Sequence, residues 1–129
     1  MNKKNLEVQR YSLVNPRSCS LGVITFNNLE WLEHSVQIVN LSVLGIGIES
    51  SQQIMPGLVW FKKRVGGHKC GALRWSNPNG LHYRGGIEFI DLSRDTEEYL
   101  QKQIKKSRPY QPFPDPEQII STLIATISK

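Results

Sequence analysis

Cysteine is scarce in this chain of 129 residues, which contains only Cys19 and Cys70. Small secreted domains held together by disulfides use far more cysteine, so we predict no disulfide scaffold. The first residues, Met1 to Lys4, lead into polar sequence rather than into the apolar core of a signal peptide. We therefore expect a cytoplasmic protein.

Long apolar runs are also missing. The richest stretch, residues 119–127, is interrupted by Ser121, Thr122 and Thr126 and is much shorter than the about 20 residues that span a bilayer. We expect no membrane span. Hydrophobic residues make up 39% and charged residues 21% of the sequence, which is ordinary usage for one folded globular domain.

The motifs of common enzyme classes are absent as well. The sequence has no P-loop and no Gly-x-Gly-x-x-Gly fingerprint, and no nucleophile elbow surrounds a serine or cysteine. His68 and Cys70 stand two apart, but His34, His82 and Cys19 are too distant in sequence to complete a recognised metal-ligand spacing. We expect neither an enzyme nor a metal site.

Positive charge is in excess, with 16 Lys and Arg against 11 Asp and Glu, for a net charge of +5. This balance favours partners that carry phosphate. The basic run Lys62-Lys63-Arg64 follows Trp60 and Phe61, a combination that nucleic-acid-binding barrels use to track the backbone and stack on bases. The alternative is a solvated hairpin with aromatic residues in the core. We favour the hairpin and do not expect nucleic acid as a partner.

Strand-like segments dominate residues 21–90 and are separated by turn-rich spacers. We predict six strands, over residues 21–26, 35–40, 45–49, 57–63, 71–75 and 83–90. Spacers such as "NN" at 27–28, "GGH" at 66–68 and "SNPNG" at 76–80 mark the turns. Strands at this spacing without helices between them indicate an antiparallel barrel or sandwich.

Helical patterns begin after Asp91. Ser93 is placed to cap a first helix, acidic residues fill its first turn and lysines its last, and Leu100 and Ile104 give it a narrow apolar stripe. A proline-rich connector over residues 108–116 ends it. Asp115 then caps a second helix that runs from Pro116 to about Ser128.

The second helix carries an apolar face at helical spacing. Its members are Ile119, Ile120, Leu123, Ile124 and Ile127. A face this apolar needs a covering surface. We predict that it packs on its own barrel, and the alternative is a face that binds a partner protein.

A polar pair interrupts one of the predicted strands, where Asn40 and Ser42 stand two apart and Gly45 follows. Residues at i and i+2 of a strand point to the same face, so the two side chains can present hydrogen-bonding groups to one ligand. Gly45 would allow backbone conformations, including positive φ, that a side chain resists.

Taken together, these segments resemble the PilZ domain, a bacterial module that senses cyclic di-GMP. Asn40-x-Ser42-x-x-Gly45 matches the family's Asp/Asn-x-Ser-x-x-Gly motif, and "GLVWF", "GALRW" and "YRGGIEFIDL" resemble its later strands in order and spacing. The resemblance covers roughly residues 10–105. It implies a mainly β fold, a six-stranded antiparallel PilZ-type split barrel with C-terminal α-helices.

The resemblance also implies an Arg-x-x-x-Arg segment before the first strand, which binds phosphate and stacks on guanine. A planar guanidinium suits both contacts. Here the match is partial: Arg17 lies where the second arginine belongs, 23 residues ahead of Asn40, the first falls on Leu13, and Arg10 lies three residues too early.

The resemblance implies a non-enzymatic cyclic di-GMP receptor or adaptor. Arg17 and Arg10 would contact phosphate and guanine, Asn40 and Ser42 the guanine edge, and Gly45 would form the turn. Trp75 either walls the base site or belongs to the core. The alternative is a degenerate PilZ domain that binds an unidentified protein partner and no nucleotide.

We divide the chain into an N-terminal segment (1–16), a barrel with its following helix (17–107), and a connector with the C-terminal helix (108–129).

Overall fold

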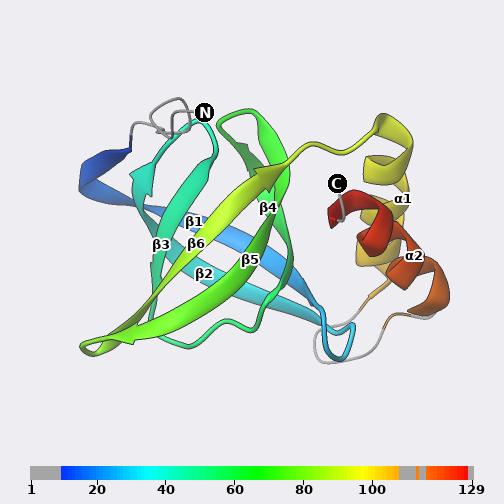
Figure 1. Ribbon diagram of the computed structural model, residues 1–129, viewed down its shortest axis with the longest axis horizontal. Coiled ribbons are helices and arrows are strands. Elements are labelled where there is room, and N and C mark those ends of the chain that lie inside the picture. Colours follow the sequence, from blue (N-terminus) through cyan, green and yellow to red (C-terminus); the bar gives the residue numbers. More distant parts are fainter. Residues whose placement is uncertain (1–9, 108–112, 114–115, 128–129) are drawn as a thin grey trace, which may run out of the picture.

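Six antiparallel strands close into a barrel, as the sequence predicts, and two helices follow (Figure 1). The computed structural model describes residues 10–107, 113 and 116–127. The strands are β1 (Tyr11–Thr25), β2 (Trp31–Leu41), β3 (Gly45–Ser50), β4 (Gly57–Val65), β5 (His68–Asn79) and β6 (His82–Ile90). Around the barrel they follow the order β1-β2-β3-β6-β5-β4. β3, which follows the polar pair in sequence, therefore lies beside β6, which is distant in sequence.

The inside of the barrel is filled by alternate residues of every strand, as expected for strands with one buried face. Ile46 and Ile48 of β3, Val59 and Phe61 of β4, and Ile87 of β6 belong to this core and are almost fully buried. The residues between them face outward. This alternation fixes which side chains of β3 and β6 can meet a ligand on the outer surface.

The largest departures from regular pairing lie in two strand pairs. In the β1–β2 pair, Ser12 faces Asn40 and Arg17 faces Ile38. Between these two pairs the chain advances five residues along β1 but only two along β2. In the β4–β5 pair, Trp60 faces Cys70 and Val65 faces His68, which is the same imbalance. Each strand therefore arches away from its neighbour, as β-bulges do.

β1 is longer than predicted, because the sequence places the first strand at residue 21 and the structure begins it at Tyr11. Pro16 lies inside the arch of β1. A proline is tolerated in a strand only where no ladder hydrogen bond is needed, and a bulge is such a place. The predicted boundary between residues 16 and 17 consequently falls within β1.

The helices follow the capping signals in the sequence. α1 (Arg94–Lys106) begins after Ser93, whose hydroxyl accepts a hydrogen bond from the Thr96 amide at 3.2 Å. Asp95 and Glu97 lie in its first turn, where the helix dipole favours negative charge. α2 spans Pro116–Ile127, and the predicted cap Asp115 and most of the connector lie outside the described residues. In the part of the chain that the structure describes, neither helix has the length and apolarity to cross a membrane.

Both helices lie together at one end of the barrel, opposite the start of β1 (Figure 1). They bury a second hydrophobic cluster against the outside of the strands, made of Ile24, Trp31, Leu58, Trp60, Cys70, Leu100, Phe113, Ile119 and Leu123. The prediction that the terminal helix packs on its own barrel is thus confirmed for Ile119 and Leu123. Ile120 and Ile124 remain exposed, and the side chain of Ile127 lies outside the described residues.

Candidate functional site

A cavity of about 440 Å³ lies on the outer face of β3, β6 and β5. Glycines form its floor: Gly45 and Gly47 come from β3, and Gly85 and Gly86 from β6. Gly47 and Gly86 pair directly across the two strands. The absence of side chains at these positions lowers this part of the sheet, where Gly45, Gly47 and Gly85 are buried and Gly86 is half-buried.

Gly45 is required by the close approach of β6. A Cβ atom at this position would stand 3.0 Å from the carbonyl carbon of Ile87 and closer still to its oxygen. The expectation of a positive φ at Gly45 is wrong, because Gly66, Gly67 and Gly80 are the described glycines with that geometry. The constraint on this residue comes from its neighbour strand and not from its own turn.

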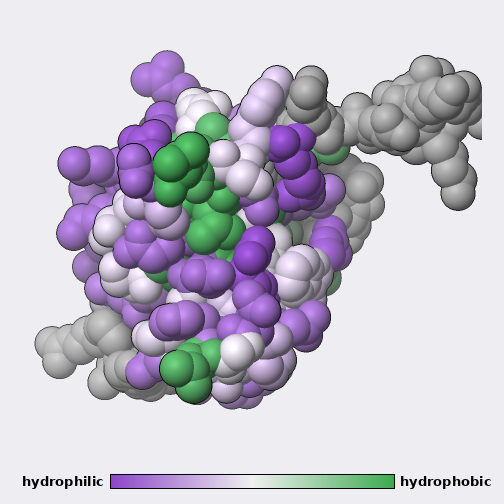
Figure 2. Space-filling view, turned by 90° about the vertical axis from the view of Figure 1, so that its left-hand side faces the viewer, coloured by the Kyte–Doolittle hydropathy of each residue, from purple (hydrophilic) through white to green (hydrophobic). Residues whose placement is uncertain are grey.

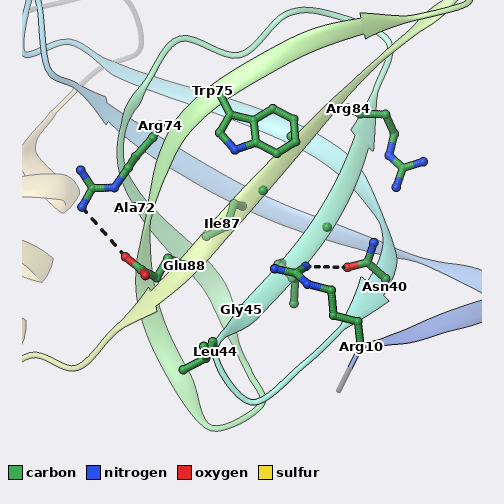
Figure 3. A pocket seen from close by; sticks show the side chains of 14 residues that line it. Arg10, Asn40, Leu44, Gly45, Ala72, Arg74, Trp75, Arg84, Ile87 and Glu88 are labelled. Atoms are coloured by element: carbon green, nitrogen blue, oxygen red, sulfur yellow. Dashed lines mark hydrogen bonds and ion pairs between the residues drawn. The ribbon is translucent and has the colours of Figure 1, made fainter. Parts of the chain in front are cut away.

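Asn40 and Arg10 meet at the edge of the glycine floor. The side chain of Asn40 lies over Gly47, since a Cβ atom there would stand 2.6 Å from Asn40 Oδ1. Arg10 Nη1 donates a hydrogen bond of 3.3 Å to the same oxygen (Figure 3). The neutral carboxamide orients the guanidinium without cancelling its charge, so Arg10 keeps its positive charge for an anionic ligand.

Ser42 does not present its hydroxyl beside Asn40, which corrects the expectation from strand alternation. β2 ends at Leu41, and Ser42 is buried in the turn that follows. Its Oγ accepts hydrogen bonds from the amides of Leu44 and Gly45, both at 3.2 Å, and donates one to the carbonyl oxygen of Gly45 at 3.3 Å. The serine of the motif thus shapes the turn that leads into the glycine floor.

Trp75 lines the cavity and is 49% exposed, so of the two predicted roles its position fits the wall of a site and not the core. Its indole lies over Gly86, where a Cβ atom would stand 3.1 Å from the ring. Pairing between β5 and β6 is irregular from Leu73 to Ser76. This bulge leaves Arg74 and Trp75 both outside the barrel although they are adjacent in sequence.

Three arginines surround the floor, two of which the sequence reasoning missed. Figure 3 shows the Arg10–Asn40 pair and the Arg74–Glu88 pair on opposite sides of the cavity, with Trp75 between Arg74 and Arg84. Arg74 approaches Glu88 at 4.0 Å, and Arg84 also lies 3.6 Å from Glu49 of β3. Such exposed ion pairs are weak and can rearrange around a ligand. The period of two along "YRGGIEF" could have identified Arg84, because it shares the outer face with Gly86.

Arg17 is not brought together with the other predicted site residues. It lines a different cavity, with Cys19, Ile38 and Lys63 among its neighbours. The physical reason is the arch of β1, which separates Arg17 from the start of the strand where Arg10 lies. Arg10, Asn40, Gly45 and Trp75 therefore share one cavity, and Arg17 and Ser42 do not line it.

Neither thiol is prepared for nucleophilic chemistry. Burial, together with the smaller effects of the Glu97 and Asp91 charges, raises the pKa of the Cys70 thiol to about 12. Burial also raises the pKa of Cys19, against an opposing effect of the Arg17 charge. A thiol with a raised pKa forms little thiolate at neutral pH. Within the described residues, no three His, Cys, Asp or Glu side chains gather as metal ligands.

The arrangement offers recognition groups: the Asn40 carboxamide, an aromatic wall and guanidinium groups. Comparisons with models of protein families and with curated proteins find no match to this chain. The geometry of the cavity, together with the motif that lies in it, therefore carries the functional argument.

Proposed function

We propose that this protein is a cyclic di-GMP receptor of the PilZ type. The observation that carries the proposal is the Arg10 guanidinium, which Asn40 holds at the edge of the glycine floor. The motif residues Asn40 and Gly45 and the family-like Trp75 line the same cavity. The cavity volume of about 440 Å³ suits part of a small ligand, because ligand pockets commonly enclose about 300–1,000 Å³.

Each feature of the cavity has a role in this proposal. A guanine base packs against the half-exposed indole of Trp75, because aromatic rings stack on the faces of bases. Asn40 offers a carboxamide to the base edge. Arg10 contacts a phosphate, for which a planar guanidinium provides two parallel N–H donors. Arg84 adds positive charge on the same face.

A second candidate function is a domain that binds a protein partner and no nucleotide. The observation in its favour is the turn after β2, where Val43 is 79% exposed and Leu44 is 53% exposed. Apolar side chains at the rim of a cavity are typical of surfaces that contact other proteins. Leu44 also lines the cavity, so a bound nucleotide and a protein partner would share this rim.

Calorimetric titration with cyclic di-GMP distinguishes the two functions. We expect saturable binding by the unmodified protein and weaker binding of cyclic di-AMP, which has the same phosphate ring and a different base. Arg10→Ala should weaken binding by about tenfold to a hundredfold, the usual effect of removing a charged hydrogen bond. Arg17→Ala is the matched control, because it removes the same charge from outside the cavity.

Two results would contradict the proposal. If the unmodified protein takes up no cyclic di-GMP, the receptor function is wrong and the protein-binding function is favoured. If Arg17→Ala abolishes binding while Arg10→Ala leaves it unchanged, the nucleotide binds elsewhere on the barrel.

A further inference from the structure

A second cavity, of about 540 Å³, lies between the arch of β1 and the end of β4. We call it the β1–β4 cavity. Its volume is within the range of about 300–1,000 Å³ that is usual for small-molecule sites. The glycine floor, Arg10 and Trp75 do not line it, so it is separate from the proposed cyclic di-GMP site.

The wall of the β1–β4 cavity is positively charged. Lys62, Lys63 and Arg64 follow one another in β4 and are all exposed, although a regular strand would turn the middle residue inward. The bulge between Trp60 and Val65 explains this departure. Arg17 of β1 completes the charged wall.

Most of this charge is free to meet a ligand. Arg64 pairs with Glu97 of α1 and donates a further hydrogen bond of 3.4 Å to the carbonyl oxygen of Gly67. Arg17, Lys62 and Lys63 take part in no ion pair with another described residue. Three uncompensated cations at one cavity favour a dianion over a single negative charge.

The floor of the β1–β4 cavity is apolar. Leu13, Leu41 and Val65 line it and pack against the barrel core, and Ile38 and Cys19 of that core reach the same surface. The Arg17 charge acts on the pKa of Cys19, so the field of the wall extends to the floor. Figure 2, which faces the side of the molecule where β1 begins, shows a larger hydrophobic area and a separate smaller one below it, both bordered by hydrophilic side chains.

We propose that the β1–β4 cavity binds a phosphate monoester that carries an apolar body. The phosphate, which has about −1.5 to −2 charges at neutral pH, meets Arg17, Lys62 and Lys63. The apolar body covers Leu13, Leu41 and Val65 and removes them from water, which adds affinity in proportion to the area covered. Neither half of such a ligand alone would use both the wall and the floor.

Octyl phosphate, kept below its micelle concentration, is the probe for calorimetry. We expect saturable binding of one molecule for each chain. Methyl phosphate has the same head group and should bind about tenfold or more weakly, because the buried methylenes are missing. Octyl glucoside has the same chain and a neutral head, and should bind weakly for lack of charge.

Variants locate the site. Arg17→Gln should weaken octyl phosphate binding by about tenfold to a hundredfold, and Lys63→Gln by several-fold. Lys102→Gln is the matched control, since it removes an exposed positive charge on α1 outside the cavity. Backbone amide NMR signals of residues 17–20 and 62–66 should shift during the titration.

Four results would overturn the proposal. The first is equal affinity for octyl phosphate and octyl glucoside, and the second is unchanged binding by both cavity variants. The third is displacement of octyl phosphate by cyclic di-GMP, which would make the cavity part of the nucleotide site. The fourth is binding to phosphatidylglycerol vesicles without binding to free octyl phosphate, which would assign the charged wall to a membrane surface. The first, second and fourth outcomes involve no nucleotide, so they are independent of whether cyclic di-GMP binds.

Discussion

Gly47→Ala should disable the proposed nucleotide site without changing any residue that would contact phosphate. The new methyl group would stand 2.6 Å from Asn40 Oδ1, where ordinary contact begins at 3.4 Å. Asn40 Nδ2 would be closer still, so the carboxamide must move by more than about 0.8 Å, the difference between those two distances. Its hydrogen bond with Arg10 is already long at 3.3 Å and cannot keep its geometry unless Arg10 moves as well.

The expected loss of binding follows from that contact. A hydrogen bond that involves a charged group contributes about 1.5–3 kcal/mol net. Because Arg10 is exposed, we expect the Arg10–Asn40 hydrogen bond to contribute near the lower end of that range. Cyclic di-GMP should then bind about tenfold more weakly in calorimetry, since about 1.4 kcal/mol corresponds to a factor of ten. The free energy of unfolding should change by less than about 1 kcal/mol, because alanine also restricts the unfolded chain.

Gly45→Ala is the informative comparison, because its methyl group meets the backbone of Ile87 and not a side chain that can rotate away. We expect this variant to lose about 1–3 kcal/mol of stability, the usual cost of forcing an atom into a packed region. Thermal denaturation measures the contrast between the two variants. If Gly47→Ala binds cyclic di-GMP as tightly as the unmodified protein, the oriented Arg10–Asn40 pair is not what the ligand recognises.

Three further predictions test other parts of the structure. Trp75→Ala should cost about 1–3 kcal/mol of cyclic di-GMP binding through lost stacking, with little change in melting temperature because the indole is 49% exposed; unchanged affinity would remove Trp75 from the site. Burial lowers the pKa of His34 below 6.5, so the unfolded chain takes up a proton more readily and stability should fall as pH drops below about 6.5 towards that lowered pKa; a His34→Gln variant with the same pH slope in urea denaturation would contradict this. Leu123→Ala should cost about 2–5 kcal/mol of stability, because the side chain is buried, while the exposed Ile124→Ala should cost less than about 0.5 kcal/mol; equal effects would show that α2 does not pack as described.

Local sequence patterns predict most of the secondary structure here. The serine cap, the acidic first turn and the lysine-rich last turn placed α1 correctly, because these signals act within one helix turn. Strand-like runs between turn-rich spacers located the six strands of the barrel. The predicted bounds were wrong for β2, which begins at Trp31 and not at residue 35, and for β5, which continues to Asn79 through the predicted turn at 76–80. The start of β1 was missed, since Pro16 and the polar residues around it do not alternate like a half-buried strand.

The site was predicted only in part, because its assembly depends on pairing between distant strands. Asn40, Gly45 and Trp75 line one cavity, as the motif suggested. Gly45 is constrained by Ile87 of β6, a contact that appears only once β3 and β6 are known to be neighbours. Arg17 was predicted beside Asn40 from its distance along the chain, and the arch of β1 carries it to the other cavity.

The most direct test of the proposed function is a titration with cyclic di-GMP followed by NMR of the backbone amides and the Trp75 indole N–H. The proposal predicts saturable shifts at Gly45, Gly47 and Gly86 and at the indole of Trp75, with much smaller shifts at Arg17 and Lys63. Spectra that stay unchanged at excess ligand, or shifts confined to the β1–β4 cavity, would contradict it.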